Sequence, residues 1–595
     1  MSITVTLVRD DRVAAGRVTV TIPEDETIKQ VADSAGVECP TFCALPETPP
    51  GSDRAAYTSG SCGLCNVELR LPSGETDSVC ACRYRLTSAE DGAVITVHSE
   101  RLDRSRDAIA TLIALQHRAS CLTCPLGAEQ CELRAMLAGH DLRLDRFPRP
   151  DDQPVPPDES HPVLVVQPDN CVLCRRCEAI CPVGAVQFVG RGHDTRVVID
   201  PDRCVNCGQC THVCPAAAIV EKPAIRQVQE ALVDPNTFVT VQVAPAVRVA
   251  VGEAFGVAPG TNLIAKLYGA LRLLGFDAVF DTDFAADLTI VEEATELVGR
   301  LDGHGALPMI TSCCPGWIRY VEIFWPDLLP HLSSCKSPQQ MLGAVTKNWW
   351  AQQVGVAPGA VVSVAVMPCT AKKFEAGREE MADDGRPHVD HVLTTRELIR
   401  MLKSAGLHLP DVPEGAPTPM LSESTGAGAI FGATGGVLEA ALRTVHAIVT
   451  GTELADPEVR AVRGTAGVRS AAVDLAGRSI EVAVVHGLHN LPPLLQQIRD
   501  GSSPYTFVEV MACPGGCVGG GGQPHGFDMA VRRERAAGLF ATDAALPVRR
   551  SHQNAEVAAL RAALSDDERH RLLHTHYAHD TSQRPGRLGV APDRD

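Results

Sequence analysis

The chain has 595 residues, which gives room for about four domains. Hydrophobic residues make up 45% of it and charged residues 21%, as in ordinary globular proteins, and the formal net charge is −18. This acidic balance argues against a nucleic-acid binder, because phosphate binding requires a basic face. Against this ordinary background, the 23 cysteines are unusual.

The surroundings of the cysteines decide how they are interpreted. The N-terminus carries no basic region followed by an apolar core, and no apolar run of about 18 residues occurs, so we expect no membrane span. We therefore expect a cytoplasmic protein, in a reducing compartment where disulfides are rare. Many of the cysteines stand in Cys-x-x-Cys spacing. In a reducing compartment, this spacing indicates metal clusters rather than scattered buried thiols.

Residues 1–98 contain six cysteines and the pattern of a small domain. Alternating residues predict strands at 3–8 and 18–22 with a turn at 10–11, and apolar spacing predicts a helix near residue 31. A glycine-rich cysteine loop follows at 59–65, and such glycines let backbone N–H groups approach cluster sulfurs. Together these elements indicate a β-grasp ferredoxin-like domain with a [2Fe–2S] cluster.

This arrangement resembles the N-terminal domain of [FeFe]-hydrogenases and of the large iron–sulfur subunit of respiratory complex I. Its gap between Cys43 and Cys62 is longer than usual in these families, which indicates a surface insertion around residues 49–52. Of two candidates for the fourth ligand, Cys80 and Cys82, the second is favoured by its placement before residues 91–92. The ligands that the resemblance implies are Cys43, Cys62, Cys65 and Cys82, with Cys80 as the alternative.

Residues 99–148 are expected to form a helical domain with a second cluster. Four residues separate His117 from Cys121, which predicts that both lie on one helix face and reach one metal. A lone histidine is more often an ordinary surface or core residue, but this one precedes a Cys-x-x-Cys pair. The segment resembles the His/Cys3 [4Fe–4S] site of the same two families, with one extra residue before the last cysteine. The implied ligands are His117, Cys121, Cys124 and Cys131.

The strongest local signal lies in residues 160–225, after a Pro- and Asp-rich linker at 148–157. Two runs of Cys-x2-Cys-x2-Cys-x3-Cys-Pro repeat with a period of 33 residues. This is the bacterial two-cluster ferredoxin motif, in which the fourth cysteine of each run binds the other cluster. A zinc site gives no reason for such a repeat. The two predicted [4Fe–4S] ligand sets are Cys171, Cys174, Cys177 and Cys214, and Cys204, Cys207, Cys210 and Cys181.

After a joint at residues 222–237, a large domain is expected over 238–540. Strand-like runs, at 239–243 and 361–366, alternate with helical patterns, which indicates α/β architecture. The chain as a whole is therefore predicted to be a multidomain mixture of α+β and α/β units. Four segments of this domain are rich in Cys-Pro or glycine, which suits a backbone that turns sharply at a cluster: 311–317, 367–373, 431–436 and 511–522. The cysteines available for one further cubane are Cys314, Cys369, Cys513 and Cys517.

These four segments resemble the signature segments of [FeFe]-hydrogenases. The likeness continues through residues 244–245, 287–297, 336–340, 393–397 and 573–577, and residues 541–595 are expected to resemble the hydrogenase small subunit. The family's active site is the H-cluster, a [4Fe–4S] cubane joined by one cysteine to a diiron unit with CO, cyanide and dithiolate ligands. The resemblance implies that the four cysteines of this domain bind the cubane and that Cys517 is the bridge.

The reaction 2 H⁺ + 2 e⁻ ⇌ H2 requires a proton donor beside the open iron. Cys313 is a spare thiol next to a cubane ligand. Glu293 and Glu296 share a face of an expected helix. Such pairs usually mark only a solvated surface, but their surroundings match the family. The positions that match the family's proton path are Cys313, Glu293, Glu296, Ser333 and Arg300.

Cyanide ligands are anionic and need hydrogen-bond donors. Lys372 suits this role, because a buried ammonium is stable only when it is paired. Lysine is also scarce in this chain, so a lysine pair directly after a cluster cysteine is not generic surface charge. Other residues match the family's diiron pocket, with ordinary core packing as the less favoured explanation for the apolar ones: Ala244, Pro245, Ser337, Gln339, Met367, Phe431 and Gly432.

The leading hypothesis is an [FeFe]-hydrogenase in which one [2Fe–2S] and three [4Fe–4S] clusters relay electrons to the H-cluster. The external partner would be ferredoxin or a flavin-containing NAD(P)H-oxidising subunit, since no dinucleotide fingerprint stands out here. Maturation proteins would supply the diiron unit. Three alternatives are an electron-transfer subunit sharing only residues 1–225, a cytosolic iron–sulfur assembly protein without the diiron pocket, and a hydrogen sensor with an altered proton path.

Overall fold

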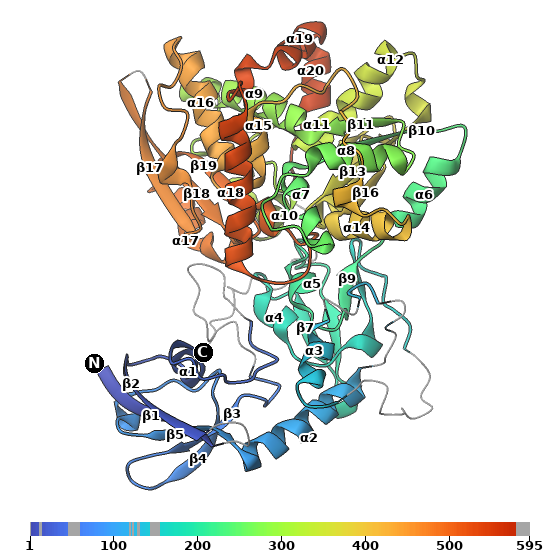
Figure 1. The fold of residues 1–595 in the computed structure, drawn as a ribbon. Coiled ribbons are helices and arrows are strands. Elements are labelled where there is room, and N and C mark those ends of the chain that lie inside the picture. The colour runs from blue at the N-terminus through green and yellow to red at the C-terminus, as the bar shows by residue number, and fades with distance from the viewer. Residues whose placement is uncertain are drawn as a thin grey trace.

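The computed structural model describes residues 2–10, 15–45, 60–117, 121, 124–127, 131–142, 155–475 and 477–578. The expected insertion at 49–52 lies outside these residues, as do residue 11 of the predicted turn and most of the linker at 148–157. In Figure 1 the chain rises from a small N-terminal sheet through a narrow middle part to a large upper part. The result is a mixed α/β multidomain fold.

The N-terminal part is a five-stranded sheet in the order β2-β1-β5-β3-β4. β1 and β2 form an antiparallel hairpin, and β5 runs parallel to β1 at the centre. The predicted alternation is present, because Ile3, Val5 and Leu7 all point into the core. The elements are β1 (Ser2–Asp10), β2 (Ala15–Pro23), α1 (Ile28–Ser34), β3 (Asn66–Arg70), β4 (Thr76–Cys80) and β5 (Val94–Ser99).

Helix α2 (Glu100–Gln116) leads from this sheet toward the middle part, and α3 (Glu132–Ala138) follows it. The prediction that His117 and Cys121 share a helix face is wrong. His117 is the residue after the helix, with extended backbone at φ −89° and ψ 123°. Its N–H donates a hydrogen bond of 3.3 Å to the carbonyl oxygen of Ala114, three residues earlier. Such 3₁₀-type bonds commonly form the last turn of a helix.

The middle part consists of two similar halves, as the sequence repeat predicts. Each cysteine run turns through two left-handed residues, Leu173 and Arg175 in the first and Asn206 and Gly208 in the second. Each run then enters a short helix that carries its third cysteine. The elements are β6 (Leu164–Val166), α4 (Arg176–Ile180), β7 (Val186–Val189), β8 (Arg196–Ile199), α5 (Gln209–Val213) and β9 (Ile219–Glu221).

The joint at 222–237 contains α6 (Ile225–Val233), and beyond it lie two four-stranded sheets. The first, in the order β11-β10-β13-β16, is wholly parallel, and its strands are nearly continuous apolar runs, as buried parallel strands usually are. Its strands are β10 (Phe238–Val243), β11 (Ala278–Asp281), β13 (Val361–Met367) and β16 (His391–Thr394).

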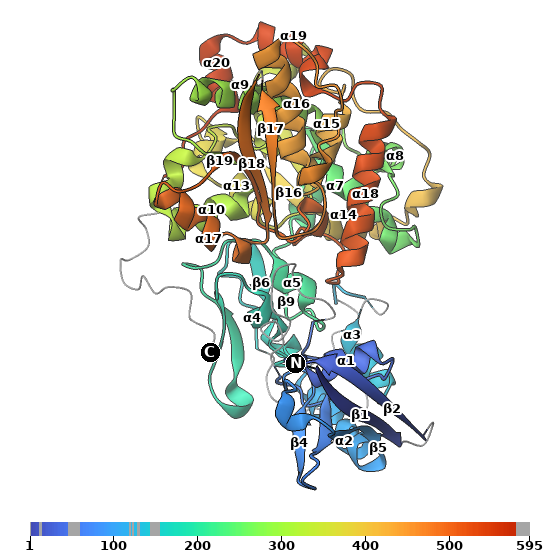
Figure 2. The same ribbon diagram turned by 90° about the vertical axis from the view of Figure 1, so that its left-hand side faces the viewer.

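The second sheet has the order β12-β19-β18-β17, with only β17 antiparallel, and Figure 2 shows β17 and β18 beside α16. α9 contributes to the hydrophobic cores next to both sheets and so joins the two halves. The strands are β12 (Met309–Ile310), β17 (Val468–Leu475), β18 (Arg478–His486) and β19 (Tyr505–Met511). A small hairpin is formed by β14 (Ala382–Asp383) and β15 (Arg386–Pro387).

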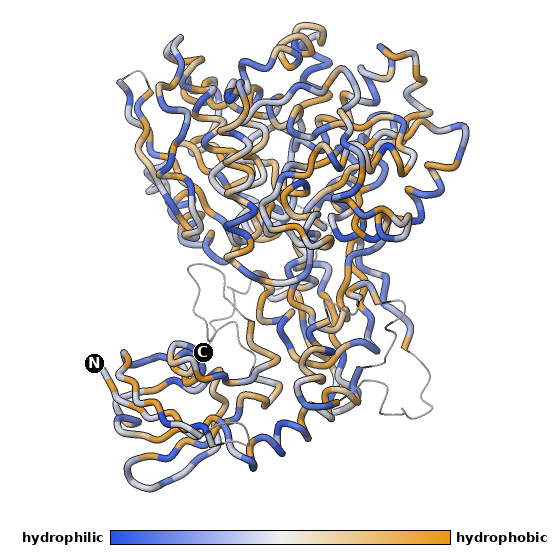
Figure 3. The backbone as a smooth tube through the Cα atoms, in the orientation of Figure 1, coloured by the Kyte–Doolittle hydropathy of each residue, from blue (hydrophilic) through white to orange (hydrophobic). Residues whose placement is uncertain are grey.

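Helices surround both sheets, and Figure 3 shows hydrophilic and hydrophobic residues alternating along them. They are α7 (Pro245–Arg248), α8 (Ile264–Leu273), α9 (Thr282–Leu301), α10 (Pro315–Phe324), α11 (Pro338–Val345), α12 (Ala351–Gln353), α13 (Ala371–Ala376), α14 (Thr395–Ser404), α15 (Gly426–Ala429), α16 (Gly436–Thr450) and α17 (Pro492–Arg499). Within the described ranges, no helix has the length and apolar character needed to cross a membrane.

The C-terminal segment returns across the upper part as α18 (Met529–Ala545), α19 (Ala555–Ala563) and α20 (Asp566–Leu573). The expected domain boundary between residues 540 and 541 falls inside α18. After α20 the chain pairs with the segment following α10, where His574 and Cys335 form a backbone bridge. The C-terminal helices therefore pack onto the large domain as part of it.

Candidate active site

A cavity opens where the loops that follow β10, β12, β13 and β19 meet. These are the carboxyl ends of parallel strands from both sheets, the usual place for ligands in open α/β folds. α9 and α11 close its other sides through Ala286 and Gln339. Of the residues predicted for the site, those that line the cavity are Ala244, Pro245, Cys313, Cys314, Gln339, Met367, Cys369, Lys372, Phe431, Gly432, Cys513 and Cys517.

Four of the cavity cysteines offer the donor set of an iron–sulfur cubane. Cys314 begins α10, and its sulfur lies 3.4 Å from the backbone N–H of Ala512, which donates to it. Cys513 and Cys517 flank a tight turn with positive φ at Gly515 and Gly516. None of the four is joined in a disulfide, and burial raises the pKa of Cys369 to about 12. The donor chemistry and the enclosed space both fit a cluster.

Lys372 brings a positive charge to the same cavity. Its Nζ lies 3.1 Å from the carbonyl oxygen of Cys313 and 3.0 Å from Oε2 of Glu375. Burial alone would lower the pKa of Lys372, but the buried Glu375 carboxylate raises it, so the ammonium stays charged. Ser337 and Gln339 donate to the same Glu375 oxygen at 2.9 and 3.1 Å.

Glu375 is a functional residue that the sequence analysis missed. It stands three positions after Lys372, and this spacing of opposite charges on a helix is a signal that could have identified it. Ser337, predicted for the pocket, does not line the cavity. It acts through Glu375 instead, and so helps to hold Lys372 in place.

The predicted proton-path residues are neighbours in the order Cys313, Glu293, Ser333, Glu296 and Arg300, and Glu296 is the one that is partly exposed. Glu293 is 1% exposed on α9, and burial together with the neighbouring Glu296 carboxylate raises its pKa to about 8. The Ser333 hydroxyl donates to Oε2 of Glu296 at 3.0 Å. Arg300 pairs with the other Glu296 oxygen at 2.6 Å. Among the described residues, Oε2 of Glu293 has no partner within normal hydrogen-bond geometry, and the Ser333 side chain lies beside the same carboxyl.

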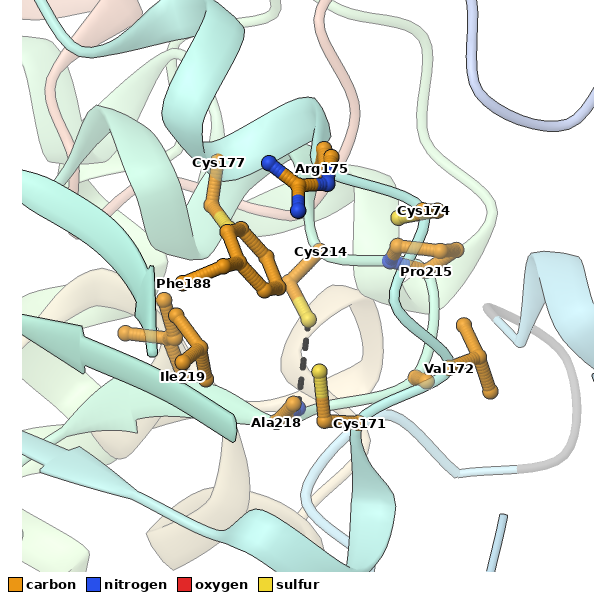
Figure 4. Close-up of a pocket in the computed structure, with 12 residues that line it drawn as sticks. Cys171, Val172, Cys174, Arg175, Cys177, Phe188, Cys214, Pro215, Ala218 and Ile219 are labelled. Atoms are coloured by element: carbon orange, nitrogen blue, oxygen red, sulfur yellow. Dashed lines mark hydrogen bonds between the residues drawn. The ribbon is translucent and has the colours of Figure 1, made fainter. Parts of the chain in front are cut away.

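The two ferredoxin-type cysteine sets are both assembled. Cys171, Cys174, Cys177 and Cys214 line a second, smaller cavity, in which the Ala218 N–H donates to the Cys214 sulfur at 3.1 Å (Figure 4). In the other half, the Ala185 N–H donates in the same way to Cys181 at 3.2 Å. The electrostatic neighbours of the Cys207 thiol are Cys210, Cys181 and Cys204. Each group thus contains the fourth cysteine of the opposite run.

The N-terminal cysteines separate the two candidates for the fourth [2Fe–2S] ligand. The sulfurs of Cys65 and Cys82 are 3.1 Å apart, and Cys82 also contacts Cys43. Cys80 also contacts Cys65, but its thiol donates to Oδ1 of Asn66 at 3.1 Å. The geometry therefore favours Cys82.

The His117 region is consistent with a cluster in spite of the helix error. The Cys131 thiol has Cys124 and Cys121 as electrostatic neighbours. His117 is buried, and its Nδ1 lies 3.0 Å from the carbonyl oxygen of Asn170. Metal-binding histidines usually present one nitrogen to a carbonyl or carboxylate in this way while the other binds the metal.

A glycine segment joins the ferredoxin part to the cavity. Gln209 Nε2 donates to the carbonyl oxygen of Gly519 at 2.9 Å, and the Thr211 hydroxyl donates to that of Gly521 at 3.1 Å. A Cβ at Gly521 would overlap the carbonyl oxygen of Cys207. The second ferredoxin-type cysteine set therefore adjoins the loop that carries Cys517.

We expect Gly521→Ala to destabilise the chain by about 1–3 kcal/mol, the usual cost of overpacking a close contact. The added methyl group must push the Cys517 loop away from Cys207. Gly299→Ala on α9 is the matched control, because nothing lies within 4 Å of its Cβ position. The measurement is the anaerobic thermal midpoint of both variants, and equal midpoints would show that the contact is not tight.

Comparison with known proteins identifies the family. Over 581 residues the chain is 40% identical to the NADP-reducing hydrogenase subunit HndD of Solidesulfovibrio fructosivorans, covering 94% of this chain and 97% of that protein. The chain belongs to the iron-only, or [FeFe], hydrogenases. It is also 38% identical to iron hydrogenase 1 of Clostridium pasteurianum over 574 residues, covering 93% of this chain and 97% of that protein.

Family models and a solved structure agree with this assignment. The C-terminal domain of the iron-only hydrogenase large subunit matches residues 237–521, a 4Fe–4S dicluster domain matches 155–218, and the iron hydrogenase small subunit matches 529–580. A solved variant of [FeFe]-hydrogenase HydA1 from Chlamydomonas reinhardtii is 42% identical, with a TM-score of 0.54, and covers 60% of this chain and 98% of that one.

These matches favour the hydrogenase hypothesis over two of the alternatives, the assembly protein and the electron-transfer subunit. Cytosolic iron–sulfur assembly component 3 of Pongo abelii is 34% identical, but its match covers only 51% of this chain. An electron-transfer subunit would share only the first 225 residues. The [FeFe]-hydrogenase relatives cover nearly the whole chain, so this protein is an oxidoreductase of that family, with an H-cluster domain and [4Fe–4S] binding.

Proposed function

We propose that this [FeFe]-hydrogenase interconverts protons, electrons and hydrogen in the cavity between its two sheets. The observation that carries the proposal is the convergence of Cys314, Cys369, Cys513 and Cys517 on one space with Cys313 and Lys372. The four cysteines would hold the cubane, with Cys517 as the bridge to the diiron unit. When bound, the H-cluster supplies the redox chemistry of 2 H⁺ + 2 e⁻ ⇌ H2.

The other cavity residues prepare the site for that chemistry. Lys372, fixed by Glu375, presents a charged N–H donor to anionic ligands. Met367 and Phe431 line the cavity with apolar groups and exclude water. Cys313 holds a proton at its sulfur inside the cavity. Beyond it, the proton route would pass through Glu293, Ser333 and Glu296 to Arg300.

Electrons would reach the cavity through the two ferredoxin-type clusters. The set that includes Cys207 is nearer, because it adjoins the Cys517 loop. The set that includes Cys174 lies further from the cavity and is contacted by the regions of both N-terminal clusters. Ser61, in the [2Fe–2S] loop, donates to the carbonyl oxygen of Cys174 at 3.0 Å, and His117 contacts Asn170, next to Cys171. We therefore propose a branched relay, with a β-grasp [2Fe–2S] domain on one branch and a His/Cys3 cluster on the other.

The electron partner is proposed to be a flavin-containing NAD(P)H-oxidising subunit, with ferredoxin as the alternative. The similarity to a subunit of an NADP-reducing hydrogenase supports this choice. Hydrogen evolution driven by reduced ferredoxin alone, at the rate seen with a reduced dye, would favour the alternative. We also propose a cytoplasmic location, because 23 thiols stay reduced there, and cell fractionation tests it.

Infrared spectroscopy of the anaerobically matured protein tests the central proposal. Bands of metal-bound CO and cyanide together with hydrogen evolution would support it. Bands without turnover would favour the sensor hypothesis. The absence of bands in protein with full iron content after proven maturation would leave an electron-relay protein and overturn the proposal.

Glu293→Gln tests the proton route through its pH dependence. With a pKa raised to about 8, the Glu293 carboxyl keeps its proton below that pH and loses it above, whereas glutamine does not titrate. We expect the variant to evolve hydrogen at least about tenfold more slowly and to lose the step near pH 8. Glu292→Gln, the same change on the same helix, is the control. An unchanged pH profile in Glu293→Gln would contradict the route.

A further inference from the structure

A carboxylate, a thiol and an imidazole meet at the outer end of the proposed proton route. Ligand atoms of Glu296, Cys335 and His574 all lie within 4.8 Å of one another. They come from α9, from the segment after α10 and from the residue after α20. Cys335 is fully buried, whereas Glu296 and His574 are partly exposed, so the group is open to solvent on one side.

The histidine of this group is already oriented. Its Nε2 lies 3.4 Å from Glu292, and Arg561 holds that carboxylate through a bond of 2.6 Å. Ser334 Oγ lies 2.9 Å from Nδ1 of His574 and 3.1 Å from Oε2 of Glu296, so Nδ1 is the nitrogen that faces Glu296. Metal-binding histidines nearly always place their second ring nitrogen against a carboxylate, a backbone carbonyl or water, and here the partner is a carboxylate.

We propose that Glu296, Cys335 and His574 bind one zinc ion, with water as the fourth ligand. Sulfur, nitrogen and oxygen donors together are the set that zinc accepts in tetrahedral sites, whereas magnesium and calcium prefer oxygen alone. Ligand atoms around zinc are about 3–4 Å apart, so small side-chain rotations close the site.

Charge and protons balance in the bound state. The Cys335 thiol releases its proton to water as its sulfur binds, and zinc keeps its charge. The metal replaces the Ser334 hydroxyl between Glu296 and His574. Oε1 of Glu296 keeps its hydrogen bond to Arg300, so zinc binds only Oε2. Zinc bound in this way removes one carboxylate oxygen from proton exchange.

The functional consequence rests on the proposed proton route. Glu296 is the outermost carboxylate of that route, and a metal-bound carboxylate no longer accepts protons at neutral pH. Zinc is therefore a reversible inhibitor that acts far from the H-cluster. Removal of the metal by a chelator restores the route.

The test uses the anaerobically matured holoenzyme, zinc chloride and a competing chelator, followed by desalting. Zinc and iron per chain are then measured in the wild type and in Cys335→Ser, His574→Gln and His408→Gln. His408 pairs with Asp411 at an exposed site and is the matched histidine control. We expect the wild type and the control to retain one additional zinc ion per chain, the two site variants to lose it, and iron to stay constant.

Hydrogen evolution in the same samples separates the metal site from the proton route. We expect zinc to slow the wild type at least about tenfold and to leave Cys335→Ser unaffected. Zinc that is not retained, or that is retained equally by both site variants, overturns the metal site. Zinc that is retained specifically without inhibition leaves the site standing and overturns the place of Glu296 in the proton route.

Discussion

Replacing Cys313 with alanine is expected to lower hydrogen turnover by about 10²–10⁴-fold, the usual contribution of a positioned proton donor. Cys313 lies in the cavity beside the proposed cubane ligand Cys314, and Lys372 contacts its backbone carbonyl. In the proposed proton route, the thiol links the cavity to the buried Glu293 carboxyl, with which it interacts electrostatically. Its removal would break proton delivery without removing a proposed cluster ligand.

The measurement pairs a hydrogen-evolution assay with infrared spectra of the same sample. The CO and cyanide bands should keep wild-type intensity, because the four proposed ligands are untouched. Cys39→Ala is the matched control, since it removes the same atoms from another buried thiol, which lies in the N-terminal part and outside the cavity. Turnover within about twofold of the wild type, with full band intensity, would remove Cys313 from the proton route.

Cys517→Ala should have the largest effect of any single change, a loss of all detectable turnover together with the CO and cyanide bands. Cys517 begins a short turn at the cavity wall, after Gly516 at φ 86°. By family resemblance it is the bridge between the two parts of the H-cluster. No other described side chain between Cys513 and Gly521 offers a sulfur that could replace it.

Accessory-cluster signals provide the internal reference for this variant. Electron paramagnetic resonance of the relay clusters should be unchanged, because their cysteines lie in other parts of the chain. Cys80→Ala serves as the control, since its thiol donates to Asn66 in the N-terminal sheet, far along the chain from the cavity. Retention of the bands at full iron content in Cys517→Ala would show that another group bridges the cluster.

Local features of this structure were predictable where hydrophobic residues or cysteines repeat at regular spacing. The alternating residues of β1 and β2 and the helical spacing of α1 predicted the right elements, and the strand-like runs at 239–243 and 361–366 match β10 and β13. The cysteine repeat predicted the doubled middle part, because left-handed turns and short helices follow from the motif itself. The cavity cysteines were found in the same way, from Cys-Pro and glycine contexts.

Long-range arrangement could not be predicted in this way. Nothing in the local pattern shows that the large domain splits into two sheets sharing one cavity, since strand pairing depends on distant residues. The His117 error arose because an ideal helix was continued past Gln116. Glu375 was missed because its importance comes from Ser337, Gln339 and Lys372 meeting at one oxygen, and two of these lie on another helix segment.

The glycine segment after Cys517 sets a condition for transplanting domains among these enzymes. Its carbonyl oxygens at Gly519, Gly520 and Gly521 accept bonds from Gln209, His212 and Thr211 of the ferredoxin part. A foreign ferredoxin fused at residue 225 would leave these acceptors unmatched and would loosen the loop that holds a proposed cluster ligand. A successful chimera must therefore carry residues 206–212 as a unit with its catalytic domain.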